Sequence, residues 1–401
     1  METLNYLLAG FAAALSVHNL LFALAGCVLG TLVGVLPGVG PAAGTAILIP
    51  LTFNLDPAGA IIMLSAIYYG AMYGGTITSV LLNVPGEAAS VITCIDGYQM
   101  ARQGRGGAAL GIAAIGSFIG GTIAVIALVV VAAPLAALAL KFGPPEFFAL
   151  MLFGLCLVTG LAGRSLIAGV LMTVMGLLIS LIGIDPVRGA PRFTFGMPDL
   201  YDGLGFIPVV MGLFGVGEIL ATAEKPYREI IKTNLRDVMP SREEWSNSFG
   251  AIMRGTGIGF FLGLIPGVGA LIPTFMSYIM EKRISRTPER FGNGAIEGVA
   301  GPETANNSYA NAAMLPLLTL GIPSSPTIAV LMGAFIINGL TPGPFLFTEK
   351  PILVWTIIAS FFIGNVILLI LNLPLVGLWA KILEVPYQYV CVGTLLFCLL
   401  G

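Results

Sequence analysis

Charged residues are scarce in this sequence. Only 9% of its 401 residues are Asp, Glu, Lys or Arg, and 57% are hydrophobic, whereas a soluble domain carries about 25% charged residues. Apolar windows at 109–140, 147–184, 207–221 and 352–380 approach or exceed the ~20 residues that a membrane-spanning helix needs. The composition excludes an ordinary soluble domain and predicts an all-α polytopic membrane protein with roughly ten membrane segments.

Several motifs of enzymes and metal sites are absent. The sequence has no G-x-x-x-x-G-K-[ST], no H-E-x-x-H and no C-x-x-C, and its one histidine is His18. P-loop hydrolysis, metalloprotease chemistry and a cysteine metal site are therefore excluded. We expect the five cysteines to be packing residues and His18 to be interfacial. No basic patch with interleaved aromatics indicates nucleic-acid binding, so the chain is predicted not to be an enzyme and to need no cofactor.

Cationic side chains are missing from long stretches. No Lys or Arg precedes Arg102, and none lies within 30–95 or 295–349. The cations gather instead in three clusters, at 102–105, 225–254 and 282–290. Short basic loops are typical of the cytoplasmic side, and the lack of a basic segment at the start predicts no cleaved signal peptide. A bound carboxylate would meet backbone dipoles, hydroxyls and a co-bound Na⁺ rather than an arginine.

Glycine and proline, by contrast, are abundant and form a repeat. Two ladders of glycines at four-residue spacing lead into Pro-Gly-Val-Gly, with an offset of 229 positions: Gly26, Gly30, Gly34 and Gly38, and Gly255, Gly259, Gly263 and Gly267. A second similarity pairs LLNVPGEAAS (81–90) with LTLGIPSSPT (318–327), at an offset of 238. Internal repeats with broken apolar helices are typical of transporters. We predict two inverted structural repeats with broken helices and re-entrant hairpins.

The repeat divides the chain into five segments. They are an N-terminal interfacial segment (1–18), repeat 1 (19–160), connecting membrane segments (161–223), a cytoplasmic amphipathic linker (224–254) and repeat 2 (255–401). A solvated linker is the alternative for the fourth. Arg254 and Lys282 flank 255–280, and cytoplasmic flanks on both sides would make this stretch a re-entrant hairpin with its tip at 266–269. The last residues are still apolar, so we expect either that the chain ends in the membrane or that the sequence is truncated.

The helix breaks are the predicted binding site. A helix broken inside a membrane leaves N–H and C=O groups free, and these are tolerated only when buried or lining a cavity. Freed N–H groups suit an anion and freed carbonyls suit Na⁺. The predicted substrate residues are Gly38, Gly40, Thr78, Gly267, Gly269, Asn306, Asn307, Ser324 and Ser325. The predicted cation residues are Asn83, Pro85, Gly86, Glu87, Glu303, Gly321 and Pro323. The alternatives are small-residue helix packing at the first break and surface loops at the second.

The run GPETANNSYAN (301–311) is unusually polar for this chain. Glu303, Asn307 and Asn311 lie at i, i+4 and i+8, on one helical face. An ionisable residue in an apolar setting indicates function, although a loop before the membrane is the alternative. The matching positions of the first half are Ser65 and Tyr69. The repeat therefore predicts an asymmetric site, with the acid and amides in its second half.

Four motifs make the resemblance to a known family specific. They are GVLPGVGPAAGTAILIPLTF (34–53), YYGAMYGGTITSVLLNVPGEAASV (68–91), DGYQMARQGR (96–105) and GPETANN (301–307). Over essentially its whole length the chain resembles the TctA family, the large membrane subunit of tripartite tricarboxylate transporters.

The resemblance implies a multi-pass importer of organic anions in the bacterial inner membrane, with Na⁺ as coupling ion. It also implies two partners, a small TctB-like membrane subunit and a periplasmic TctC-like solute-binding protein; a homodimer stays open. Alternating access, elevator-like by analogy, is the expected mechanism. The alternatives are a carboxylate carrier that works without a binding protein and a non-transporting membrane scaffold.

Overall fold

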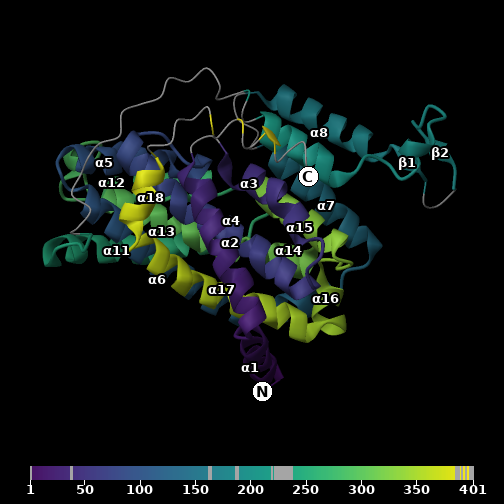
Figure 1. The fold of residues 1–401 in the computed structure, drawn as a ribbon, viewed down its shortest axis with the longest axis horizontal. Coiled ribbons are helices and arrows are strands. Elements are labelled where there is room, and N and C mark those ends of the chain that lie inside the picture. Colours follow the sequence, from purple (N-terminus) through teal and green to yellow (C-terminus); the bar gives the residue numbers. More distant parts are fainter. Residues whose placement is uncertain are drawn as a thin grey trace.

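The computed structural model describes residues 2–36, 39–160, 165–185, 189–217 and 238–383, with the single positions Leu220, Tyr389, Val392, Leu395 and Leu396. Helices dominate these residues (Figure 1). The described strands are two short ones, β1 (Gly183–Ile184) and β2 (Pro191–Arg192), which pair antiparallel. The prediction of an all-α fold is confirmed.

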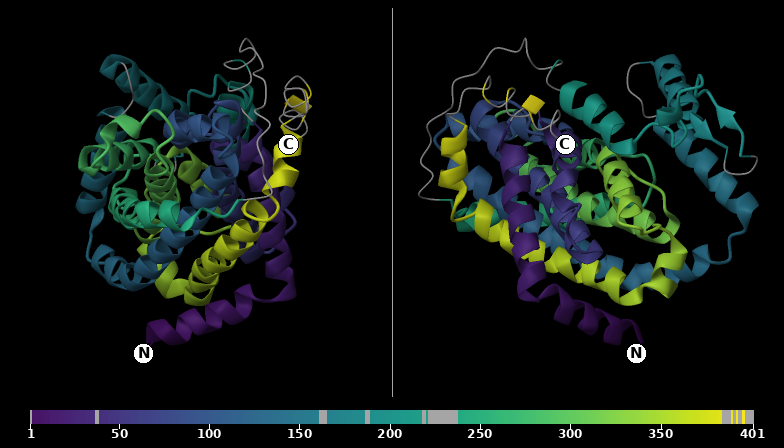
Figure 2. Two further views of the ribbon diagram at one scale, coloured as in Figure 1. Left: turned by 90° about the vertical axis from the view of Figure 1, so that its left-hand side faces the viewer. Right: turned by 45° about the vertical axis from the view of Figure 1, so that its right-hand side comes forward.

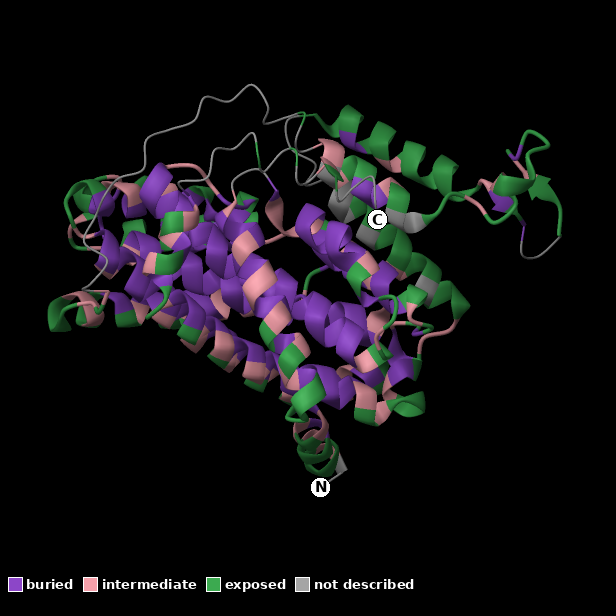
Figure 3. Ribbon diagram, viewed as in Figure 1, coloured by how far each residue is buried: buried purple, intermediate pink, exposed green. Residues whose placement is uncertain are grey.

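Four described helices are long and apolar enough to cross a membrane: α2 (Val17–Val35), α4 (Pro57–Leu82), α6 (Gly106–Ala139) and α17 (Pro351–Asn372). The apolar window of α4 is entirely buried inside the protein, and Figure 3 shows the buried residues concentrated at the centre of the bundle. The outer helices keep exposed apolar side chains, such as Val130 and Phe261. This distribution suits a protein whose surface contacts lipid.

The first half begins with α1 (Glu2–Ala14), which projects from the bundle (Figure 2). After α2 the chain breaks and continues as α3 (Gly40–Leu48) and the 3₁₀ turn η1 (Ile49–Thr52). The central helix α4 follows, and then η2 (Ala88–Ser90) and α5 (Val91–Arg102).

The second half repeats this order. α11 (Arg242–Gly263), the break and α12 (Leu271–Ile284) lead through η5 (Pro288–Arg290) to α13 (Glu297–Ala312), α14 (Met314–Leu320) and α15 (Pro326–Ile337). α11 begins within the stretch 224–254, where Ser241 and Glu244 form a capping box. Residues 224–237 lie outside the described residues.

The remaining elements connect or cover the two halves. They are α7 (Pro144–Gly160), α8 (Leu166–Ser180), η3 (Pro198–Leu200), α9 (Phe206–Val210), the π-helical η4 (Met211–Val216), α16 (Pro344–Glu349) and α18 (Val376–Ile382). α7 and α8 pack on each other at one edge, and the β1–β2 pair extends beyond them (Figures 1 and 2).

The glycine ladders let two helix pairs approach at backbone distance. A Cβ at Gly30 would lie 2.3 Å from the carbonyl oxygen of Ile67, and one at Gly259 would lie 2.3 Å from that of Ala305. The same contact recurs along both ladders: Gly26, Gly30 and Gly34 face Met63, Ile67 and Ala71, and Gly255, Gly259 and Gly263 face Gly301, Ala305 and Tyr309. The partner positions keep the offset of 238, so α2 packs on α4 as α11 packs on α13.

The second breaks also share their geometry. Asn83 (φ 55°, ψ 35°) and Gly321 (φ 70°, ψ 25°) both end a helix in the left-handed conformation. Four residues later, Glu87 (φ −148°, ψ 166°) caps η2 and Ser325 (φ −154°, ψ 166°) caps α15. The backbone of the two halves is therefore alike, while a carboxylate stands in one half where a hydroxyl stands in the other.

Candidate functional site

A buried carboxyl group lies where the two halves meet. Glu303, on α13 of the second half, is 1% exposed. The hydroxyl of Thr76, on α4, donates to its Oε2 at 2.6 Å, and the hydroxyl of Thr93, on α5, donates to its Oε1. Both donors belong to the first half, so the Glu303 side chain joins the two halves inside the protein.

A second buried carboxyl group, from the first half, packs against the face of α13 that carries Glu303. Glu87, in the second break of the first half, is 7% exposed. Its Oε1 accepts a hydrogen bond from the Asn306 amide at 2.8 Å, and its Oε2 accepts one from the Ala89 N–H at 2.9 Å. Glu87 thus caps η2 and holds α13 with the same side chain.

The network continues to α6 through Ser117. The Asn307 amide donates to the Ser117 hydroxyl at 2.7 Å, and that hydroxyl donates to the backbone oxygen of Glu303 at 3.3 Å. Small residues allow this approach, because a Cβ at Gly120 would lie 2.4 Å from the Thr304 side chain. Asn311 donates within α13, to the Asn307 carbonyl.

The environment of the two carboxyl groups holds no cationic partner among the described residues. The ion pairs that the described residues form all involve other acids: Asp56, Glu244, Asp185, Glu281 and Glu297. A carboxylate buried without a compensating charge is strongly unfavourable. Glu87 and Glu303 are therefore candidates for binding a proton or a cation.

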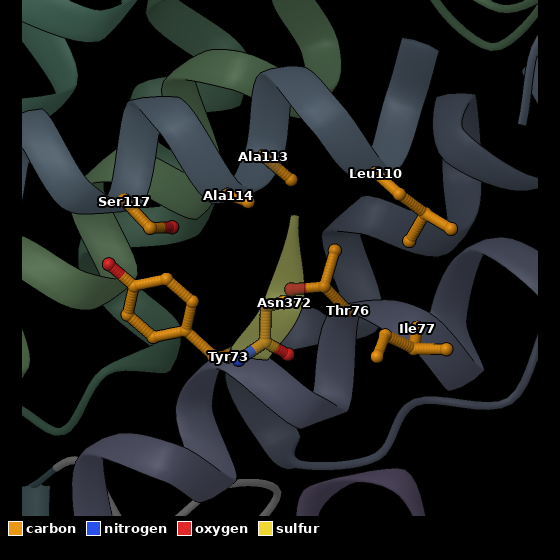
Figure 4. Close-up of a pocket in the computed structure, with 8 residues that line it drawn as sticks. All are labelled: Tyr73, Thr76, Ile77, Leu110, Ala113, Ala114, Ser117 and Asn372. Carbon is orange, nitrogen blue, oxygen red and sulfur yellow. The ribbon is translucent and has the colours of Figure 1, made fainter. Parts of the chain in front are cut away.

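A small cavity is lined by Thr76 and Ser117, which both hydrogen-bond to Glu303 (Figure 4). Its volume of about 10 Å³ is close to what one water molecule requires. The polar residues around it are Tyr73, Thr76, Ser117 and Asn372, and the apolar ones are Ile77, Leu110, Ala113 and Ala114. It lies between α4, α6 and the end of α17 and is too small for an organic acid.

Asp96 positions α13 from the opposite half. Its Oδ1 accepts hydrogen bonds from the backbone N–H groups of Gly292, Gly294 and Ala295 at 2.8, 2.8 and 2.9 Å, and its Oδ2 accepts one from the Tyr278 hydroxyl at 2.9 Å. Residues 292–295 lead directly into α13. Asp96 lies one helical turn beyond Thr93, so α5 holds both the start of α13 and its Glu303.

The predicted anion-binding groups of the second half form a separate cluster. Gly267 (φ 80°) and Gly269 (φ 69°) are left-handed, which explains the glycines. The Gly269 N–H donates to the Ser324 carbonyl at 3.3 Å, and Tyr309 donates to the same oxygen at 3.1 Å. Ser325 caps α15 by accepting from the Ile328 N–H. This cluster joins the first and second breaks of one half.

The corresponding residues of the first half are also engaged in packing. Thr78 donates to the carbonyls of Gly34 and Val35 at 3.3 and 3.4 Å. A Cβ at Gly86 would lie 2.3 Å from the Gly34 oxygen. Gly40 is left-handed, with φ 65°, whereas Gly38 lies outside the described residues.

The structure thus brings together four predicted site residues, Glu87, Glu303, Asn306 and Asn307. It adds Thr93, Ser117 and Asn372, which the sequence analysis did not select. Ser117 carries the one hydroxyl of the stretch 106–121, and a polar side chain isolated in a long apolar helix was the signal available. Asn372 carries the same signal within the apolar stretch 366–378, whereas Thr93 carries none.

Comparisons with known proteins agree with the motifs. The family model described as "Tripartite tricarboxylate transporter TctA family" matches residues 20–401. An "Uncharacterized 52.8 kDa protein in TAR-I ttuC' 3'region" of Agrobacterium vitis is 48% identical over 402 residues, covering 100% of this chain and 80% of that protein. An "Uncharacterized protein in TAR-II ttuC' 3'region" of the same organism is 52% identical over 143 residues, covering 36% of this chain and 59% of that protein. No solved structure matches the chain.

Proposed function

The chain belongs to the tripartite tricarboxylate transporter TctA family, and we propose that, as the large membrane subunit, it imports a di- or tricarboxylate-type anion coupled to Na⁺. The transport component follows from the family. The ion coupling, the substrate class and the bacterial inner membrane as its location are our proposal.

The observation that carries the proposal is the pair of buried carboxyl groups at the junction of the halves. Glu303 and Glu87 receive hydrogen bonds from Thr76, Thr93 and Asn306 but meet no cationic side chain among the described residues. Carboxylates in such surroundings are typical of cation or proton sites in transporters. Because each bond crosses between the halves, binding a cation there would change how tightly the halves hold each other.

We place the substrate at the first and second breaks and the cation beside the acids. The anion contacts are proposed at Asn307 and at the second-half cluster of Gly267, Gly269, Ser324 and Ser325, with Gly38, Gly40, Thr78 and Asn306 as further contacts. The second-break backbone of 83–86 and 321–323 completes the proposed cation site.

We further propose that the repeats are inverted and work by alternating access. The second hairpin (255–280) ends at Arg254 and Glu281, which lie among basic residues. No Lys or Arg precedes Arg102, so the first hairpin, between His18 and Asp56, has neither of them around it in the sequence. The positive-inside rule then places the ends of the second hairpin in the cytoplasm and favours the other side for those of the first. An elevator-like movement remains an analogy with other broken-helix carriers.

Accessibility labelling tests the inversion. In a variant without native cysteines, Ser246→Cys and Arg286→Cys should react only with a cytoplasmic reagent. Val17→Cys and Phe53→Cys, both exposed, should react only from the periplasm. Reaction of all four positions from one side would refute the inversion.

Uptake into proteoliposomes tests the function. Labelled citrate, succinate and aromatic acids would be offered with an inward Na⁺ gradient, with and without a TctB-like subunit and a TctC-like binding protein. We expect uptake of at least one acid that depends on Na⁺ and on the binding protein. Uptake that needs no binding protein would indicate the stand-alone carrier instead, and no uptake of any acid would indicate a scaffold.

Glu303→Gln isolates the role of the acid. It keeps the shape of the side chain and removes the charge, so we expect Na⁺-dependent uptake to be lost. Glu243→Gln, an exposed acid at the start of α11, serves as the matched control. A Glu303→Gln protein with unchanged Na⁺ dependence would show that Glu303 is structural.

A further inference from the structure

The cavity beside Glu303 is lined on one side by four oxygen-bearing side chains. Tyr73 and Thr76 come from α4, Ser117 from α6 and Asn372 from the last turn of α17. Figure 4 shows these four around the cavity, with Ile77 and Leu110 at its apolar end. The cavity thus joins two helices of the first half to α17, next to an acid of the second half.

The hydroxyl hydrogens at this cavity are engaged by other groups. Thr76 donates to the Glu303 carboxyl at 2.6 Å, and Ser117 donates to the Glu303 carbonyl at 3.3 Å. Tyr73 donates to the Asn365 amide oxygen at 2.7 Å. Each hydroxyl has one hydrogen, so toward the cavity these oxygens can act only through their lone pairs, as acceptors or metal ligands.

Asn372 supplies an acceptor without a partner. Its side chain is 4% exposed, and its amide nitrogen donates to the Leu368 carbonyl at 3.0 Å. Its Oδ1 is buried and has no hydrogen-bond partner. Buried polar atoms are nearly always paired, so this oxygen is available to a ligand in the cavity.

We infer that the cavity is a binding site for a monovalent cation of the Na⁺ type, held by the oxygens of Tyr73, Thr76, Ser117 and Asn372. Water can donate its two hydrogens to these oxygens, but unlike a cation it does not balance the buried charge of Glu303, to which Thr76 donates. Hard cations bind oxygen ligands. The carboxylate of Glu303, which does not line the cavity but accepts a hydrogen bond from Thr76, balances one positive charge, which favours a monovalent ion over Ca²⁺ or Mg²⁺.

The inference rests on the proposed Na⁺ coupling for its biological meaning, but cation binding can be measured without transport. Purified protein would be heated in detergent with NaCl or choline chloride at constant ionic strength. A cation that binds the folded state raises the melting temperature by mass action. We expect wild-type stabilisation by Na⁺ that saturates, and an apparent Na⁺ affinity at least about tenfold lower in Asn372→Leu, a difference of about 1.4 kcal/mol.

Asn338→Leu is the matched control. Asn338 lies at the end of α15 and donates to the carbonyl four residues earlier, that of Ala334, at 2.8 Å, as Asn372 does to Leu368. It does not line the cavity, so this variant should keep the wild-type Na⁺ response. Thr76→Val removes a second cavity oxygen at nearly constant volume and should resemble Asn372→Leu; it carries the test if Asn372→Leu does not fold.

The outcomes separate this site from the proposed function. Wild-type Na⁺ affinity in folded Asn372→Leu or Thr76→Val, or stabilisation by acid but not by Na⁺, would overturn the site. Na⁺-dependent uptake together with such a result would leave the transport proposal intact. A Na⁺ response that depends on Asn372, in a protein that takes up no carboxylate, would support the site and contradict the transport proposal.

Discussion

Arg254 and Glu281 form a two-point ion pair that joins the ends of the second glycine-ladder hairpin. Nε and Nη2 of Arg254 donate to the two carboxylate oxygens at 2.8 and 2.6 Å. Around the first hairpin His18 and Asp56 make a single, exposed contact, from His18 Nε2 to Asp56 Oδ1 at 3.0 Å. In both halves the residues that flank the broken segment therefore lie close together.

Loss of Arg254 should destabilise the protein. Glu281 is 3% exposed and Arg254 39%, so Arg254→Gln leaves a buried carboxylate without its partner. We expect a loss of roughly 1.5–3 kcal/mol in the free energy of unfolding, seen as a lower melting temperature in detergent. Arg290→Gln is the control, because Arg290 lies 3.8 Å from Glu297 and is itself 43% exposed. Equal losses in both variants would contradict the importance of the hairpin pair.

The ladder glycines should tolerate no side chain. A Cβ at Gly259 would lie 2.3 Å from the Ala305 oxygen, whereas one at Gly257, in the same helix, would meet nothing within 4 Å. Gly259→Ala should cost at least about 1–3 kcal/mol through overpacking, while Gly257→Ala should be neutral or stabilising because alanine favours helices. Thermal unfolding of the two variants, compared with wild type, would decide this. A neutral Gly259→Ala would mean that α11 and α13 are less tightly packed than described.

Asp96 should be needed for the placement of α13. Asp96→Ala would leave the buried N–H groups of Gly294 and Ala295 and the part-buried one of Gly292 without an acceptor, a loss of at least about 3 kcal/mol. Asp96→Asn keeps one oxygen for these groups and should cost less. Melting temperatures and Na⁺-dependent uptake of the two variants would be measured together. Equal damage in both would show that the negative charge matters more than the hydrogen bonds.

Acid should weaken the contact between α6 and α11. Burial raises the pKa of Glu244, but the hydrogen bonds from Arg105 and Ser241 and the charge of Arg105 together outweigh this effect and hold the pKa below its ordinary value. The pair therefore adds stability above the unfolded-state pKa, near about 4.3, and that stability is lost as the pH falls through the lower folded-state pKa. The range from about pH 6 to pH 3 covers the pKa of Glu244 in the unfolded and the folded state. Over this range the melting temperature should fall less in Glu244→Gln than in Glu243→Gln, which changes its exposed neighbour. Parallel curves would contradict the prediction.

Much of the fold could be predicted because it depends on local pattern. Helix length and apolarity identify α2, α4, α6 and α17, and glycines at four-residue spacing mark one face of a helix that contacts another backbone. The spacing also predicted that Glu303 and Asn307 share one face of a helix. It could not predict whether that polar run lies in a loop or in the core, because its composition suits both.

The partners of the acids could not be predicted. Thr76 and Glu303 are 227 positions apart, and nothing in the repeat pairs them, since the repeat relates equivalent positions rather than contacting ones. Asn306 and Glu87 meet for the same reason, through the packing of one half on the other.

The amino-acid sequence by itself determined a helical membrane protein with two glycine ladders, two breaks in each half and an acid in the second half, since composition and period are properties of the chain. Only the tertiary structure decided that Glu87 and Glu303 share one buried network with Ser117, and that Asn372 leaves an oxygen free beside it. These contacts depend on how α4, α6, α13 and α17 cross, and a crossing angle is set by side chains distant in the sequence.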